Sequence, residues 1–254
     1  MDLRLNNRVV LITGAGGGAG PTLARVFANE GARVALHHRP GSASAARAQS
    51  TAAEIVTTGG RAMAVAAELD STDQIAAMAE QIEAELGRVG ILVTATSAYM
   101  KQRFGEIDDA SWASVVDDLL GATFRTCRAV VPGMQADGWG RIVNIAARSG
   151  LVGVSRAAHY AAAKAAIIGL TASLAKELGP NGILVNAVAP TQILTVRDGV
   201  PSIPEDRATE MAKTIPLRRL ATPEDLASIV VWLASDANRY VSGETISLTG
   251  GDQR

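Results

Sequence analysis

Short apolar runs rich in β-branched residues recur along the chain, and segments with helical spacing separate them. The first run, at 8–12, ends in glycines, and Leu23, Val26 and Phe27 then repeat at helical spacing within 21–29. An apolar run of this length is typical of a strand buried on both faces. The pattern predicts strands over 8–12, 33–36, 62–67, 91–93, 141–145, 184–188 and 245–248, and helices over 21–29, 43–57, 72–86, 112–134, 157–178 and 223–234.

The regular alternation of strands and helices predicts the fold class. A helix between consecutive strands implies parallel pairing, so we expect an α/β fold with a doubly wound seven-stranded parallel sheet and helices on both faces. A length of 254 residues suits a single domain over 1–254. The irregular segment at about 191–216 contains Gly199, Pro201 and Pro204 and follows a strand, which predicts either a lid over a site or a surface excursion.

Composition narrows the setting and the partners. The formal net charge of −1 offers no broad field for nucleic acid or an anionic membrane, so we expect a small-molecule substrate. No apolar stretch is long enough to cross a bilayer, and Met1–Arg4 lacks a signal-peptide pattern. Cys127 is the only cysteine and is expected to pack in a helix. We therefore expect a cytoplasmic protein.

Glycines fill the turn between the first strand and the first helix. The turn reads Thr13-Gly14-Ala15-Gly16-Gly17-Gly18-Ala19-Gly20. Without side chains in the way, amides at the start of the helix can face a pyrophosphate. The strand, turn and helix context therefore predicts a dinucleotide-binding site.

Several motifs together resemble the short-chain dehydrogenase/reductase family. Gly14, Gly18 and Gly20 match its Thr-Gly-x-x-x-Gly-x-Gly motif, and Tyr160-x-x-x-Lys164, the stretch at 186–190 and Gly250-Gly251 fall where that family has them. The similarity covers essentially the whole chain. It implies a Rossmann fold, a nicotinamide-dependent oxidoreductase and a homo-oligomer, either a tetramer or a dimer.

The end of the second strand bears on the choice of cofactor. An acidic residue that binds the adenosine ribose is usual there in NAD-preferring relatives, but this chain has His38 and Arg39. A guanidinium attracts a 2′-phosphate, which favours NADP(H) over NAD(H); read as ordinary polar residues, they leave the choice open. The resemblance assigns cofactor contacts to Thr13, Gly14, Gly16, Gly17, Gly18, Gly20, His38, Arg39, Glu68, Leu69, Thr94, Ala95, Tyr160, Lys164, Pro190, Thr191, Ile193 and Thr195.

Tyr160 and Lys164 are four residues apart in a predicted helix and so share one face. An ammonium near the phenol lowers the pKa of the tyrosine, and the pair can then exchange a proton with a substrate oxygen. We expect Tyr160 to be the general acid/base. His159 is expected to be a surface or interface residue.

Two positions depart from the family pattern. Ala147 stands where the resemblance places a serine that polarises the substrate, and Leu119 stands where it places a helix asparagine. Ser149 would face the same side as Ala147 if the strand continued, and is then either a displaced catalytic donor or an ordinary loop hydroxyl. Other candidate donors are Thr94, Thr96, Ser97 and Tyr99.

These departures leave three hypotheses for function. The first is an NADP(H)-dependent oxidoreductase acting on a carbonyl or alcohol. The second is a dehydratase, cyclase or isomerase on the same scaffold, and the third is a weakly catalytic NADP-binding protein. No metal site is expected, because the three histidines and one cysteine lack zinc-ligand spacing.

Overall fold

The central sheet has seven parallel strands. In the computed structural model, which describes residues 2–197 and 199–252, their order is β3-β2-β1-β4-β5-β6-β9. Met1, Gln253, Arg254 and Asp198, which belongs to the expected lid, lie outside the described residues. The strands are β1 Val9–Thr13, β2 Arg33–His38, β3 Arg61–Ala66, β4 Ile91–Thr94, β5 Gly140–Ile145, β6 Ile183–Pro190 and β9 Thr245–Leu248. The predicted seven-stranded parallel sheet is confirmed.

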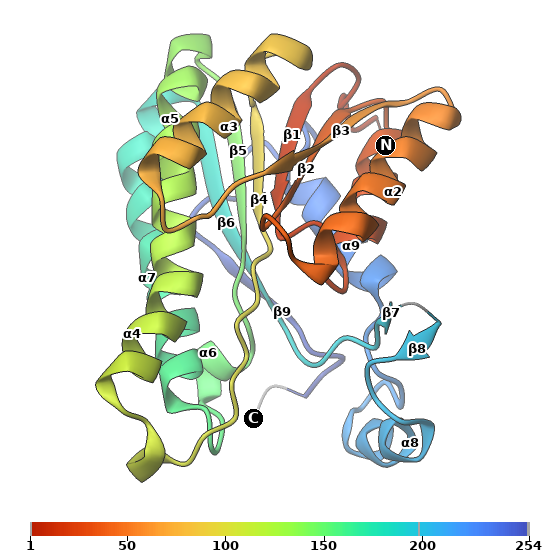
Figure 1. Ribbon diagram of the computed structural model, residues 1–254, viewed down its shortest axis with the longest axis vertical. Helices are drawn as coiled ribbons and strands as arrows, with labels where there is room; N and C mark the ends of the chain where they lie inside the picture. Colours follow the sequence, from red (N-terminus) through yellow and green to blue (C-terminus); the bar gives the residue numbers. More distant parts are fainter. Residues whose placement is uncertain (1, 198, 253–254) are drawn as a thin grey trace.

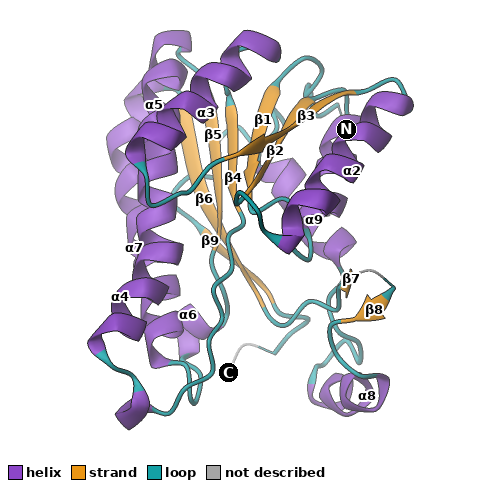
Figure 2. Cartoon of the chain, in the orientation of Figure 1, coloured by secondary structure: helices purple, strands orange, loops and turns teal. Residues whose placement is uncertain are grey.

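Helices cover both faces of this sheet (Figures 1 and 2). Val10 and Ile12 of β1 pack in one buried cluster with residues of α1 Gly20–Asn29, α2 Ala43–Thr57 and α9 Pro223–Leu233. Val9 and Leu11 point the opposite way, into a cluster with α3 Thr72–Glu85, α5 Ala122–Asp137 and α7 Ala158–Leu178. Because successive strand side chains alternate between faces, a run without polar residues supplies both halves of the core.

The predicted helix over 112–134 is built differently. It consists of α4 Asp109–Val116, the π-helical turn η2 Asp117–Gly121 and α5, which extends to Asp137. Single π turns inside helices are frequent at functional sites. This one places Asp117 and Asp118 beside a cavity described below.

The segment over 191–216 contains local structure of its own. β7 Val196–Arg197 pairs antiparallel with β8 Val200–Pro201, and α8 Glu205–Thr214 follows. Ile203, Ile215 and Leu220 form a small separate cluster, so the segment packs outside the main core. The remaining short elements are η1 Phe104–Glu106, α6 Ser149–Val152 and η3 Gly179–Asn181.

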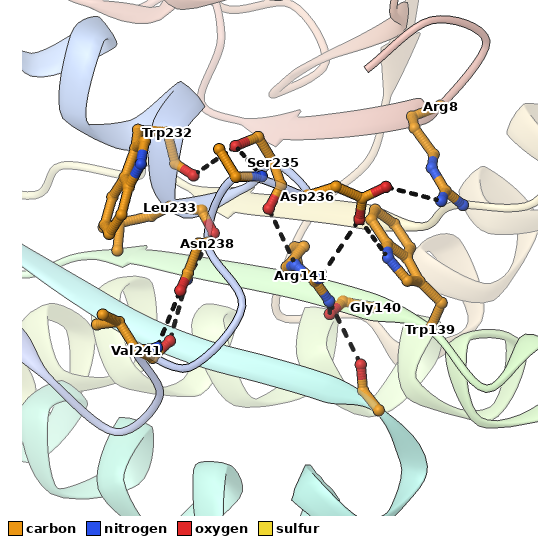
Figure 3. Close-up of polar contacts among 12 residues, drawn as sticks. Arg8, Trp139, Gly140, Arg141, Trp232, Leu233, Ser235, Asp236, Asn238 and Val241 are labelled. Carbon is orange, nitrogen blue, oxygen red and sulfur yellow. Dashed lines mark hydrogen bonds and ion pairs between the residues drawn. The ribbon is translucent and has the colours of Figure 1, made fainter. Parts of the chain in front are cut away.

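A polar cluster ties strand ends together at the amino edge of the sheet (Figure 3). The guanidinium carbons of Arg8 and Arg141 lie 3.6 and 4.6 Å from the ring centroid of Trp139. The indole nitrogen of Trp139 donates to Asp236 Oδ1 at 2.9 Å, and Arg8 lies 3.7 Å from the other oxygen of that carboxylate. Cation–π contact and ion pairing therefore join β1, β5 and the end of α9.

Among the described residues, no helix is both long and apolar enough to cross a membrane.

Candidate active site

A cavity of about 1120 Å³ opens where the carboxyl ends of the parallel strands meet, the edge at which open α/β sheets bind ligands. Most of the predicted site residues line it: Gly14, Gly17, Gly18, Gly20, Arg39, Leu69, Ala95, Ser149, Tyr160, Lys164, Pro190, Thr191, Ile193 and Thr195. Residues from five strand ends and three helices are thus brought to one place.

Five predicted cofactor residues do not line this cavity: Thr13, Gly16, His38, Glu68 and Thr94. The hydroxyl of Thr13 accepts from the amide of Ala95 at 3.2 Å, and that of Thr94 donates to Asn144 at 2.9 Å. Glu68 pairs with Arg39 at 3.1 Å. The structure therefore gives Thr13, Thr94 and Glu68 contacts that support the cavity wall.

The glycine turn has no room for side chains at key positions. A Cβ on Gly20 would lie 2.1 Å from the carbonyl oxygen of Ala15, and one on Gly18 would lie 2.8 Å from the Thr195 side chain. Gly14 has φ of 65°, a conformation that favours glycine. The turn is thus a bare backbone surface at the start of α1, as a pyrophosphate requires.

His37 holds this turn in place through hydrogen bonds, a role that no sequence motif indicated. Its Nδ1 accepts the amide of Gly14 at 3.0 Å, so Nε2 carries the proton and donates to the carbonyl of Ala67 at 3.0 Å. Burial lowers the pKa of His37 to about 4. A neutral imidazole therefore connects β1, β2 and the residue after β3.

Lys164 is buried and held by backbone. Its Nζ donates to the carbonyls of Ile145 at 2.7 Å and Thr96 at 3.4 Å. It lies 5.9 Å from the centroid of the Tyr160 ring, so the predicted juxtaposition is confirmed. Burial lowers the pKa of Lys164 to about 8.

The expected lowering of the Tyr160 pKa is wrong for the protein alone. Burial, with a smaller contribution from Tyr99, raises the pKa of Tyr160 to about 12. The rings of Tyr99 and Tyr160 meet edge to face at 5.0 Å. The ammonium of Lys164 is directed at two carbonyls, and desolvation of the phenolate outweighs its attraction.

The two positions at which the sequence analysis expects a departure from the family pattern lie at the site. Ala147 lines the cavity, and Leu119 is fully buried in a cluster that Tyr160 packs against. β5 ends at Ile145, as predicted, and Ser149 begins α6, so the condition under which Ser149 would share a strand face with Ala147 is not met. Ser149 nevertheless lines the cavity, and its buried Oγ has no hydrogen-bond partner among the described residues. Thr96, Ser97 and Tyr99 also line the cavity, whereas Thr94 does not.

His159 is buried, so its expected surface position is wrong. Its Nδ1 accepts the amide of Tyr160 at 3.0 Å, an N–H of the first turn of α7 that has no helical partner. Cys127 is buried as predicted, and burial raises the pKa of its thiol to about 12.

Two polar pairs at the cavity had no signal in the sequence. Arg148 donates to the carbonyl of Asp252 at 2.8 Å and to its carboxylate at 2.9 Å, and Arg39 pairs with Asp118. Residues so distant in the chain meet only in the fold. No group of three or more metal-ligating side chains is found within 2–197 and 199–252.

A bare glycine turn at a strand end, with a tyrosine and a lysine in the same cavity, defines a dinucleotide-binding α/β protein. Residues 14–252 match the family profile described as enoyl-(acyl carrier protein) reductase. The chain belongs to the short-chain dehydrogenase/reductase family, an oxidoreductase family whose members bind a nicotinamide cofactor.

Curated relatives cover nearly the full chain. Nodulation protein G of Azospirillum brasilense is 34% identical over 97% of this chain and 98% of its own. A 3-oxoacyl-(acyl-carrier-protein) reductase of Staphylococcus epidermidis is 33% identical over 96% of this chain and 98% of its own. A probable galactose dehydrogenase of Rhizobium meliloti is 34% identical over 97% and 95%. The relatives' names thus cover different substrates.

A solved structure gives the same fold. The gluconate 5-dehydrogenase of Burkholderia cenocepacia, in complex with NADP and tartrate, aligns with a TM-score of 0.89 and 28% identity over 98% of this chain and 96% of its own.

Proposed function

We propose that this protein is an NADP(H)-dependent oxidoreductase that interconverts a carbonyl and an alcohol in a small-molecule substrate, with Tyr160 as general acid/base. The observation that carries the proposal is the position of Tyr160 and Lys164 in the cavity that the glycine turn also lines. The nicotinamide supplies or accepts the hydride when bound.

The described residues suit such a cofactor. The pyrophosphate would lie against the backbone of the turn at Gly18, where a side chain would meet Thr195, whereas the amide of Gly20 already donates to the carbonyl of Gly17. Arg39 would bind the 2′-phosphate, and Lys164 would hold the nicotinamide ribose. Leu69, Ala95, Pro190, Thr191, Ile193 and Thr195 complete the wall.

Ser149 is our candidate for the donor that polarises the substrate carbonyl. The side chain of Ala147 cannot donate a hydrogen bond, whereas Ser149 lines the cavity and its buried hydroxyl has no partner among the described residues. An orphaned buried hydroxyl costs stability, and a substrate oxygen would satisfy it.

The test follows NADPH absorbance with purified protein over a panel of carbonyl substrates. We expect turnover, and Tyr160→Phe should lower kcat by about 10²–10⁴ while leaving NADPH binding intact. Tyr240→Phe is the matched control, because Tyr240 is 96% exposed and should keep full activity. Absence of turnover with every carbonyl, despite measured NADPH binding, would overturn the proposal.

A non-redox reaction is the second candidate, and the apolar Ala147 and Leu119 beside Tyr160 favour it. A dehydratase, cyclase or isomerase would convert substrate without changing the nicotinamide spectrum. Stoichiometric NADPH consumption would exclude it.

We further propose that the chain acts in the cytoplasm and that 191–216 serves as a lid.

We also propose that the chain forms a homo-oligomer, a tetramer or a dimer. Trp112 on α4 and Phe124 on α5 are exposed large apolar side chains, and their burial between subunits would favour self-association. Sedimentation of the protein as a monomer at all concentrations would contradict the proposed self-association.

A further inference from the structure

The guanidinium of Arg39 is held by carboxylates from two other parts of the chain. Its Nε lies 3.1 Å from Glu68 Oε2, after β3. Its Nη2 donates to Asp118 Oδ1 at 2.9 Å, from the π turn η2. Arg39 and Asp118 both line the cavity, so this contact joins the end of β2 to the helix layer at the cavity.

The two carboxylates reduce the attraction that Arg39 alone would exert on a 2′-phosphate. One guanidinium and two carboxylates sum to a net charge of −1, and a 2′-phosphate would bring further negative charge to the same place. The phosphate must also compete for N–H donors that Asp118 and Glu68 already use. A ribose hydroxyl, in contrast, can donate to a carboxylate, as in NAD-binding sites.

Of the two carboxylates, Asp118 is the one that competes more directly with a bound phosphate for Arg39. It lines the cavity, whereas Glu68 does not. Among the residues that the structure describes, its carboxylate contacts only Arg39, while the neighbouring Asp117 pairs with Arg125. Changing Asp118 therefore alters Arg39 without breaking a second contact of the described residues.

We propose that Asp118 is a cofactor-specificity residue, which holds Arg39 and thereby weakens the preference for NADP(H) over NAD(H). This proposal rests on the nicotinamide-dependent function proposed above. Asp118→Asn removes the carboxylate charge that holds Arg39 and should strengthen NADPH binding about two- to fivefold while leaving NADH binding unchanged, because the free energy of a partly exposed ion pair corresponds to a factor of that size. Added salt should shrink the difference.

The test is calorimetric titration of the full chain with NADPH and, separately, NADH. The variants are Asp118→Asn, Arg39→Ala and the double variant, and Asp109→Asn is the control because it removes one exposed charge at the start of α4. Melting curves verify that each variant is folded. Of the single variants, we expect only Asp118→Asn to bind NADPH more tightly. In the double variant with Arg39→Ala, this gain in NADPH affinity should disappear.

Three outcomes would overturn this role: an equal change for both cofactors, an equal gain in Asp109→Asn, or a full gain in the Arg39→Ala background. If the natural protein prefers NADH but Asp118→Asn still shifts the ratio toward NADPH, the proposed NADP(H) preference fails and the role of Asp118 stands. Uptake of neither cofactor overturns both.

Discussion

Which residues stand at the site was predicted better than how buried their side chains are. The spacing of Tyr160 and Lys164 placed both on one face of α7, and the structure brings them to the cavity. Their pKa values depend on burial, which sequence spacing does not contain. The same reason explains His159 and His37, whose buried contacts come from neighbouring strands and turns.

The lowered pKa of Lys164 predicts how carbonyl reduction depends on pH. Lys164 is charged below pH about 8 and loses its proton above it, while the phenol of Tyr160, with its pKa raised to about 12, stays protonated. We expect kcat for reduction to be level from pH 6 to 7 and to fall above pH 8, because the ammonium beside Tyr160 is lost. Rates at saturating NADPH across pH 6–10 check this; a level profile through pH 10 would contradict it.

Ser149 carries a second prediction. If its hydroxyl polarises the substrate carbonyl, Ser149→Ala should lower kcat about 10²–10³-fold with little change in NADPH affinity. Ser173→Ala is the matched control, because that exposed hydroxyl bonds to its own helix at Gly169. An unchanged kcat in Ser149→Ala would remove Ser149 from the mechanism.

The elements themselves follow closely from the hydrophobic pattern. Every predicted strand is present, because short apolar runs that alternate with helical segments are consistent with buried strands of a parallel sheet. The π turn at Asp117–Gly121 was not predicted, because such turns are rare and occur inside α-helices, where the surrounding pattern predicts an ordinary helix. The end of β5 at Ile145 was predicted, but the short helix α6 that begins at Ser149 was not.

The start of α9 depends on one carboxylate. Asp225 accepts from Arg219 Nη2 at 2.8 Å and from the amide of Thr222 at 2.8 Å. These contacts, the Arg219 hydrogen bond first, lower the pKa of Asp225 from 3.8 to about 2. A depressed pKa means that the stabilisation is present above pH 4 and is lost as pH falls through 2.

Asp225→Asn should therefore lower the free energy of unfolding by about 1 kcal/mol at pH 7, after allowance for solvent screening. Denaturant titrations at pH 7 and pH 2 measure it, and the difference between variant and parent should be mostly lost at pH 2, where the carboxyl of the folded parent is about half protonated. Exposed Asp73→Asn, in the first turn of α3, tests whether any helix-terminal acid gives the same loss. A difference as large at pH 2 as at pH 7 would contradict the assignment.

The residues that stabilise the fold and the residues of the candidate site lie in different parts of the molecule. Two buried layers hold the sheet, and the Trp139 cluster closes its amino edge. The cavity lies at the opposite edge of the sheet, where loops can vary in sequence without disturbing the core. The fold and the glycine turn were therefore predictable, whereas Arg39 with Asp118 and Arg148 with Asp252 depend on loops meeting in space.

Calorimetric titration with NADPH is the most direct test of the central claim that this bare turn holds a nicotinamide dinucleotide. We predict one site per chain with a dissociation constant of about 1 μM to 1 mM, weakened at least about tenfold in Gly18→Val, whose side chain would meet Thr195. Gly179→Ala, where a Cβ meets nothing, should bind as the natural protein does. No uptake of NADPH or NADH by the folded natural protein would contradict the account.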